Sequence, residues 1–240
     1  MITDIREGWV TARGVRFHYL EGGKPANGAA AIYVPGYLAD AEWFKTEMER
    51  LAPRHTVSVS LRGRGKSDAP EAGYSFHDHV EDLAAIISEL VLPRFCLIGF
   101  SVGVAFALGY AQGHADSIAG LIIQDWPAYY PARTTEWAER AITQHPTIPD
   151  HVIWAIQRES TTVPLWDGLQ RLRCPVLILR GGQPDSCLVP EDAHRYQESL
   201  PQAQVVLLEH AGHYLWRPDY EAFLAPIRNF LAALDARKEN

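Results

Sequence analysis

The chain alternates between short apolar runs and longer segments whose apolar residues recur at helical spacing. This alternation is typical of a mostly parallel sheet with helices on both faces. Before the first buried run, two half-apolar segments on either side of Gly14 predict an entry hairpin, Trp9–Ala12 and Val15–Leu20. The apolar runs that we predict as strands are Ala30–Val34, Thr56–Ser60, Arg94–Ile98, Ile118–Ile123, Val176–Leu179 and Val205–Leu208.

Two segments have the apolar spacing of amphipathic helices. The first runs from Phe76 to about Leu90, and Ser75 just before it is the expected N-cap. The second, Phe223 to Leu234, predicts a closing helix. Together with the strands, these helices predict one α/β domain over residues 1–240.

Residues 126–168 interrupt the alternation, because they contain prolines and aromatic residues but no strand-like run. We interpret this stretch as a small helical cap laid over one end of the sheet. Its large aromatic residues should pack the cap onto the body and also wall a substrate pocket. These residues are Trp126, Tyr129, Tyr130, Trp137 and Trp154.

Composition narrows the class of protein. A length of 240 residues with 47% hydrophobic and 21% charged residues is that of an ordinary globular domain. The net charge is −7 and the two signs are mixed along the chain, which argues against a nucleic-acid partner. No apolar run approaches the roughly 18 to 20 residues of a membrane span. The stretch Met1 to Gly8 has no signal-peptide pattern, and the three cysteines, Cys96, Cys174 and Cys187, suggest no disulfide framework, so we predict a cytoplasmic protein.

Candidate chemistry centres on Gly99-Phe100-Ser101-Val102-Gly103, which follows a predicted strand and leads into a helix rich in small residues. In this Gly-x-Ser-x-Gly pattern the serine sits on a sharp turn that projects its hydroxyl above the sheet. The flanking glycines are needed because a side chain would clash where strand and helix nearly touch. The N–H of Val102, at the start of the helix, can then face a developing oxyanion.

On these residues the sequence resembles the α/β-hydrolase superfamily over nearly its whole length. The other matching blocks are Val34-Pro35-Gly36-Tyr37-Leu38, Arg62-Gly63-Arg64-Gly65-Lys66-Ser67 and two C-terminal loops. The resemblance implies that the N–H of Tyr37 is the second oxyanion donor. Many members have His-Gly where this chain has Pro35-Gly36, so the loop lacks that buried anchor.

A serine hydroxyl needs a neighbouring base. His213, in Ala211-Gly212-His213 after the last predicted strand, matches the His loop of the superfamily, and we favour it over His210, which lacks a preceding glycine. For the acid that orients the histidine, Asp185 in the loop after Gly181-Gly182 is the preferred candidate. Asp125, two residues after the predicted strand Ile118–Ile123, is the alternative, because some members place the acid after the sixth strand.

Two further patterns do not predict sites. Ser60 to Ser67 ends in Gly-Lys-Ser but lacks the first glycine of a phosphate-binding loop, and Pro70 and Gly73 follow where a helix should begin. His77 and His79 could suggest a metal pair, yet positions i and i+2 of a helix point in different directions, so we expect a solvated helical face. We predict no metal and no cofactor.

The expected function is that of a serine hydrolase or acyltransferase acting on a small ester or thioester. Trp43 and Phe100 near the predicted nucleophile, with the cap aromatics, indicate an apolar or aromatic acyl group. Delivery by a carrier protein to an acceptor other than water is one alternative. Another is cofactor-independent dioxygenation by a His–Asp pair, as in some members of this fold. A binding protein with a vestigial triad is the least favoured interpretation.

Overall fold

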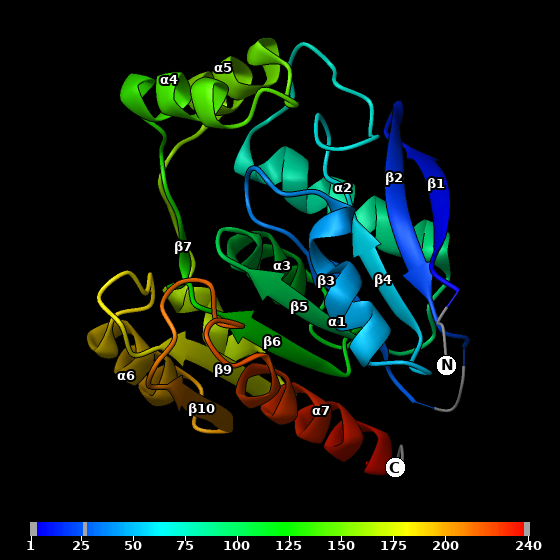
Figure 1. Ribbon diagram of the computed structural model, residues 1–240, viewed down its shortest axis with the longest axis vertical. Helices are drawn as coiled ribbons and strands as arrows, with labels where there is room; N and C mark the ends of the chain where they lie inside the picture. Colours follow the sequence, from blue (N-terminus) through cyan, green and yellow to red (C-terminus); the bar gives the residue numbers. More distant parts are fainter. Residues whose placement is uncertain (1–3, 26–27, 238–240) are drawn as a thin grey trace.

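The computed structural model describes residues 4–25 and 28–237. Residues 1–3, which belong to the N-terminal stretch considered above for a signal peptide, lie outside the described residues. An eight-stranded sheet forms the centre of the molecule, with strand order β1-β2-β4-β3-β5-β6-β9-β10 (Figure 1). The strands are β1 (Arg6–Ala12), β2 (Val15–Gly22), β3 (Ala30–Val34), β4 (Thr56–Val59), β5 (Phe95–Phe100), β6 (Gly120–Gln124), β9 (Val176–Gly181) and β10 (Ala203–Leu208).

The predicted mostly parallel sheet is confirmed. All pairs from β4 to β10 are parallel, whereas the hairpin strand β2 joins β4 in antiparallel register. Each predicted strand is present, with ends that differ by a few residues. The interior strands are mostly apolar because the sheet is buried on both faces. In β3, for example, Ile32 and Val34 belong to one core cluster and Ala31 and Tyr33 to the other.

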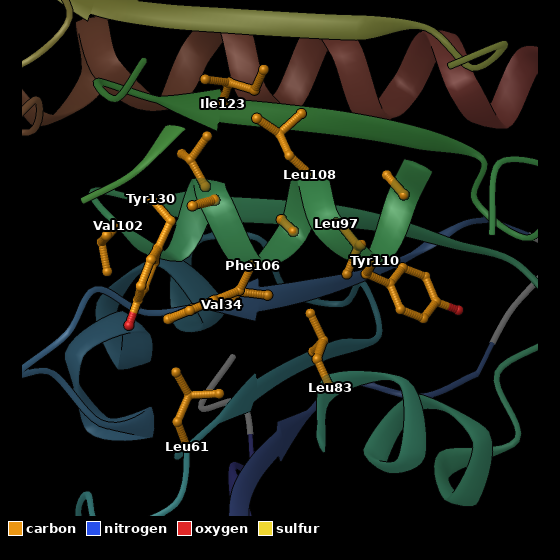
Figure 2. Packing of buried hydrophobic residues seen from close by; sticks show 14 of the residues in the cluster. Val34, Leu61, Leu83, Leu97, Val102, Phe106, Leu108, Tyr110, Ile123 and Tyr130 are labelled. Atoms are coloured by element: carbon orange, nitrogen blue, oxygen red, sulfur yellow. The ribbon is translucent and has the colours of Figure 1, made fainter. Parts of the chain in front are cut away.

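Helices cover both faces of the sheet. On one face lie α2 (Phe76–Leu90), α3 (Gly103–Gly113) and α6 (Pro190–Ser199), and on the other α1 (Lys45–Arg50), preceded by the short helix Ala41–Phe44, and α7 (Tyr220–Ala236). Figure 2 shows how α3 directs Phe106 and Leu108 into the core formed with Val34, Leu97 and Ile123 of three neighbouring strands. This packing fixes the helix that follows Ser101 against the sheet.

The predicted N-cap, Ser75, is present. Ser75 and Asp78 form a reciprocal capping box at the start of α2, and α7 extends the predicted closing helix at both ends. Helices α1 and α6 were not predicted, because each is short and its surface positions carry many charged residues.

The stretch 126–168 contains α4 (Thr135–Gln144) and α5 (Asp150–Glu159), as the helical cap interpretation expects. It also contains an antiparallel ribbon that was not predicted, formed by β7 (Tyr129–Tyr130) and β8 (Val163–Pro164). A short helix, Trp166–Arg171, then leads to β9. In Figure 1 the ribbon carries α4 and α5 away from the sheet. A two-residue ribbon is too short to leave an alternating pattern in the sequence.

Across the described residues, no helix is both long and apolar enough to cross a lipid bilayer.

Candidate active site

Ser101 stands on a sharp turn between β5 and α3. Its backbone φ is +53°, a left-handed conformation that is uncommon outside glycine. The two flanking glycines permit the close approach of strand and helix. A Cβ on Gly99 would lie 2.7 Å from the Cα of Val104, and one on Gly103 would lie 2.2 Å from the carbonyl oxygen of Val34. The backbone therefore presents the Ser101 side chain at the carboxyl end of β5.

Two backbone amides are placed to receive negative charge next to Ser101. The N–H of Val102 opens helix α3, where the helix dipole favours an anion. Tyr37 follows Gly36, whose position is so close to the nucleophile that a Cβ there would lie 3.2 Å from the Cβ of Ser101. Neither the N–H of Tyr37 nor that of Val102 is bonded to an acceptor within the described part of the chain. Both donors remain available to a substrate oxygen.

Arg64 anchors the loop that carries Tyr37. The Arg64 side chain is 1% exposed, and its Nε donates a 2.8 Å hydrogen bond to the Tyr37 carbonyl. Burial lowers the pKa of Arg64 to about 10, so the guanidinium stays charged at neutral pH. Its Nη1 donates to Nε2 of His79, whose Nδ1 in turn donates to the carbonyl of Ser75. This arginine provides the buried support that the missing histidine of the loop would give.

The same contacts correct the interpretation of His77 and His79 as a solvated pair. His77 is exposed, but His79 is completely buried and stacks on Phe106 with 4.6 Å between ring centroids. The two side chains do point in different directions, as the helical spacing requires.

His213 is held by Asp125. The distance from His213 Nδ1 to Asp125 Oδ2 is 2.8 Å. Because an ionised carboxylate only accepts hydrogen bonds, Nδ1 carries the proton and Nε2 is left as the acceptor of the neutral ring. His213 and Ser101 line the same cleft, and the ring of Phe100 stacks on the imidazole at 4.9 Å. The rival, His210, is exposed and lies outside this lining.

We predicted Asp185 as the preferred partner of His213, but the structure places the alternative, Asp125, in hydrogen-bond contact with the histidine. Asp125 follows β6 directly, and β6 is paired with β5, the strand that ends at the nucleophile. Asp185 comes four residues beyond the end of β9, where the loop carries its side chain to the surface against the backbone of Gly212. The loop expected to supply the acid instead supplies hydrogen-bond donors to it.

Asp125 is fully buried and accepts five hydrogen bonds. Besides His213, the donors are the hydroxyl of Ser186 and the backbone N–H groups of Gly181, Cys187 and Leu188. Burial alone would raise the pKa of Asp125, but the hydrogen bonds from His213, Ser186 and the backbone lower it below its ordinary value. The carboxylate is therefore ionised and fixed in orientation.

The contact with Asp125 also raises the pKa of His213. Burial by itself would lower it, but the hydrogen bond to Asp125 and the adjacent side chain of Cys187 raise the pKa to about 9. In the resting protein the imidazolium is accordingly favoured over the neutral base at pH 7.

One group of side chains in the described residues could hold a metal ion. Donor atoms of Asp125, Cys187 and His213 lie within 4.8 Å of one another. A carboxylate has about four lone-pair sites, and the hydrogen bonds to Asp125 already occupy them. The geometry therefore fits an acid that orients a histidine better than a metal ligand.

The cleft above Ser101 has a volume of about 400 Å³ and mostly aromatic walls. Of the residues predicted to wall it, four do so: Trp43, Phe100, Trp126 and Trp137. Three others fall outside the lining. Tyr130 is fully buried between Tyr37 and Phe106, while Tyr129 and Trp154 pack the cap segment. These three rings stabilise the packing of the cap, and the number of aromatic residues in the sequence does not distinguish that role from lining the cleft.

Sequence reasoning also missed several lining residues, among them Arg133, His145, Cys187 and Tyr214. Tyr214 follows His213 and Cys187 lies in the loop after β9, so their positions beside known blocks could have suggested them. Nothing in the local sequence distinguishes Arg133 or His145, because the fold of the cap alone brings them to the cleft.

Comparisons with known proteins agree with this fold. Two relatives cover most of the chain: an N-formylmaleamate deformylase of Pseudomonas putida, 27% identical over 96% of this chain and 98% of its own, and a 2-(acetamidomethylene)succinate hydrolase of Mesorhizobium japonicum, 26% identical over 86% and 89%. An esterase from Rhodococcus sp. ECU1013 has the same fold, with a TM-score of 0.77, 20% identity and coverage of 96% and 99%. Residues 31–225 match the profile of the alpha/beta hydrolase family. The chain therefore belongs to the alpha/beta hydrolase family of enzymes.

Proposed function

We propose that this protein is a serine hydrolase that cleaves a small acyl compound, an ester or thioester, through an acyl-enzyme on Ser101. The observation that carries the proposal is the arrangement of one cleft. A strained serine and a histidine held at Nδ1 by a buried carboxylate line this cleft, and two backbone amides beside the serine have no acceptor within the described residues.

The proposed reaction uses the same groups in both half-reactions, and in each of them His213 acts first as base and then as acid. Nε2 of neutral His213 takes the proton of Ser101, whose oxygen attacks the acyl carbon while the N–H groups of Tyr37 and Val102 bind the oxyanion. The imidazolium, stabilised by Asp125, then gives its proton to the departing alcohol or thiol. Water repeats the sequence in the second half, releasing the carboxylic acid and restoring Ser101.

The leaving group is the least constrained part of this proposal. By their names, the two relatives of nearly full coverage act on N-formylmaleamate and on 2-(acetamidomethylene)succinate. Both names contain an N-acyl group, so an N-acyl bond is a further substrate for the same machinery. An imidazolium with a pKa of about 9 is a suitable acid for protonating a leaving nitrogen.

Labelling by a fluorophosphonate probe tests the nucleophile. The wild-type protein should become labelled on Ser101, and Ser101→Ala should abolish labelling and lower the rate of p-nitrophenyl acetate hydrolysis by about 1,000-fold or more. Ser117→Ala, which changes an exposed serine outside the cleft lining, is the matched control. Persistent labelling of Ser101→Ala would contradict the assignment.

Cofactor-independent dioxygenation is the second candidate, because the pair of His213 with an acid after the sixth strand of the sheet is the arrangement expected for it. In that reaction the pair would deprotonate a heteroaromatic substrate and Ser101 would not be acylated. Oxygen uptake with a hydroxylated heteroaromatic compound and no added cofactor would favour this candidate. Uptake that persists in Ser101→Ala would replace the hydrolase proposal.

A further inference from the structure

The cleft contains one permanently charged side chain, Arg133, which lies in the cap segment between β7 and α4. The guanidinium carbon lies 4.4 Å from the ring centroid of Tyr37 and 5.2 Å from that of Trp137. Arg133 therefore spans the two walls of the cleft, since Tyr37 belongs to the oxyanion loop and Trp137 to the cap. A cation placed over aromatic rings is attracted by their π faces, and no hydrogen bond from the Arg133 guanidinium to an acceptor occurs within the described residues.

Arg133 has no anionic partner among the described residues. Its Nε is buried without an acceptor, and no carboxylate lies within salt-bridge distance of the side chain. Arg62, by contrast, binds Asp82. Arg64 also has no carboxylate within that distance in the described chain, but it donates to backbone carbonyls inside the fold and does not line the cleft. In a chain with 29 acidic and 22 basic side chains, an unpaired arginine facing a cleft stands out.

The surroundings of the guanidinium are fixed and contain no competing acid. The backbone N–H of Arg133 donates to the Ser160 hydroxyl at 2.8 Å, which holds the residue at the base of the cap. No Asp or Glu is among the residues that line the cleft, and Asp125 lies behind His213. The cleft thus has aromatic walls, a nucleophile at one place and an unused cation at another.

We propose that Arg133 binds a carboxylate of the substrate, so that the enzyme selects acyl compounds that carry a negative charge. This inference rests on the proposed hydrolase function and adds its substrate class. A partly buried guanidinium that lies over aromatic rings binds a carboxylate through charge-assisted hydrogen bonds. The aromatic walls would hold the apolar part of the same molecule, and Arg133 would orient it so that the acyl carbon faces Ser101.

The first experiment compares two substrates of matched chain length, mono-p-nitrophenyl glutarate and p-nitrophenyl hexanoate, in wild type, Arg133→Lys and Arg133→Met. We expect Arg133→Met to lower kcat/KM for the glutarate by about 10- to 100-fold, mainly through KM, while the value for the hexanoate changes by less than about threefold. Arg133→Lys should retain part of the preference. Equal losses for both substrates would mean that Arg133 only packs the cap onto Tyr37, and the proposal would be wrong.

The second experiment measures binding without turnover. Glutarate, added to wild-type protein, should quench or shift the fluorescence of the tryptophans that line the cleft and slow fluorophosphonate labelling, whereas the neutral diamide glutaramide should do neither. Both effects should disappear in Arg133→Met. If glutarate binds but Ser101 is never labelled, the anion site stands and the hydrolase proposal fails. If labelling is normal and glutarate has no effect that depends on Arg133, the anion site is refuted.

Discussion

Two regions of the molecule face each other across the cleft and contribute to it in different ways. The carboxyl ends of β5 and β6, with the loop after β10, provide Ser101, Asp125 and His213 from a sheet that is buried on both faces. The segment 126–168 provides Arg133 from the link between β7 and α4 and Trp137 from α4, both carried on a two-residue ribbon. In our proposal the strand ends carry the reacting groups and the cap selects the substrate. Substitutions in the first region should change kcat, and those in the second should change KM.

The largest effect should come from the buried acid. Replacing Asp125 by Asn keeps the size of the side chain, but the amide N–H can donate to Nδ1 of His213. This favours the tautomer that carries its proton on Nε2, which cannot accept the proton of Ser101, so kcat should fall by about 1,000- to 10,000-fold. The matched change Asp185→Asn replaces an exposed carboxylate in the loop after β9 and should alter kcat by less than about threefold. Steady-state hydrolysis of p-nitrophenyl acetate measures both. The reverse order of effects would return the role of the acid to Asp185.

The pH dependence should follow the raised pKa of His213. The reaction needs the neutral imidazole, and a pKa of about 9 leaves it protonated at pH 7 and neutral only as the pH rises through 9. The value of kcat/KM should therefore increase from pH 7 and level off above about pH 9.5. Cys187→Ala removes one of the two groups that raise this pKa and should move the midpoint of the rise to lower pH. A midpoint near pH 6.5 in the wild type would show that Asp125 does not stabilise the imidazolium.

The smallest effect should come from the aromatic wall of the cap. Trp137→Ala removes a ring that lines the cleft and stacks on Arg133, so KM for mono-p-nitrophenyl glutarate should increase by about three- to tenfold with little change in kcat. Trp154→Ala is the matched control, because that ring packs the cap without lining the cleft, and it should leave KM unchanged. A fall in kcat for Trp137→Ala would mean that the cap also shapes the proposed reacting groups.

The same division explains what the sequence could reveal. Strands buried on both faces leave unbroken apolar runs, and the turn at Ser101 requires glycines at fixed spacing, so the sheet and the nucleophile position are evident from local patterns. The choice between Asp125 and Asp185 is not local, because each follows a strand and only the course of the loop after β9 decides which one reaches His213. Arg133 and Tyr130 are harder still. Whether a residue of the cap faces the cleft or the core depends on how two short helices pack. No regular spacing of residues along the sequence distinguishes the two kinds of position.

The backbone at two proposed functional residues has a consequence for how this protein can change. Ser101 has a φ of +53° and Asp125 a φ of +52°, and a non-glycine residue in this left-handed region is disfavoured by roughly 1 to 2 kcal/mol. Glycine would fit both positions with less strain, although it carries neither a hydroxyl nor a carboxylate. Directed evolution that selects only for thermal stability would therefore favour glycine at these two positions and lose the proposed activity. A stabilised variant must be selected for turnover at the same time.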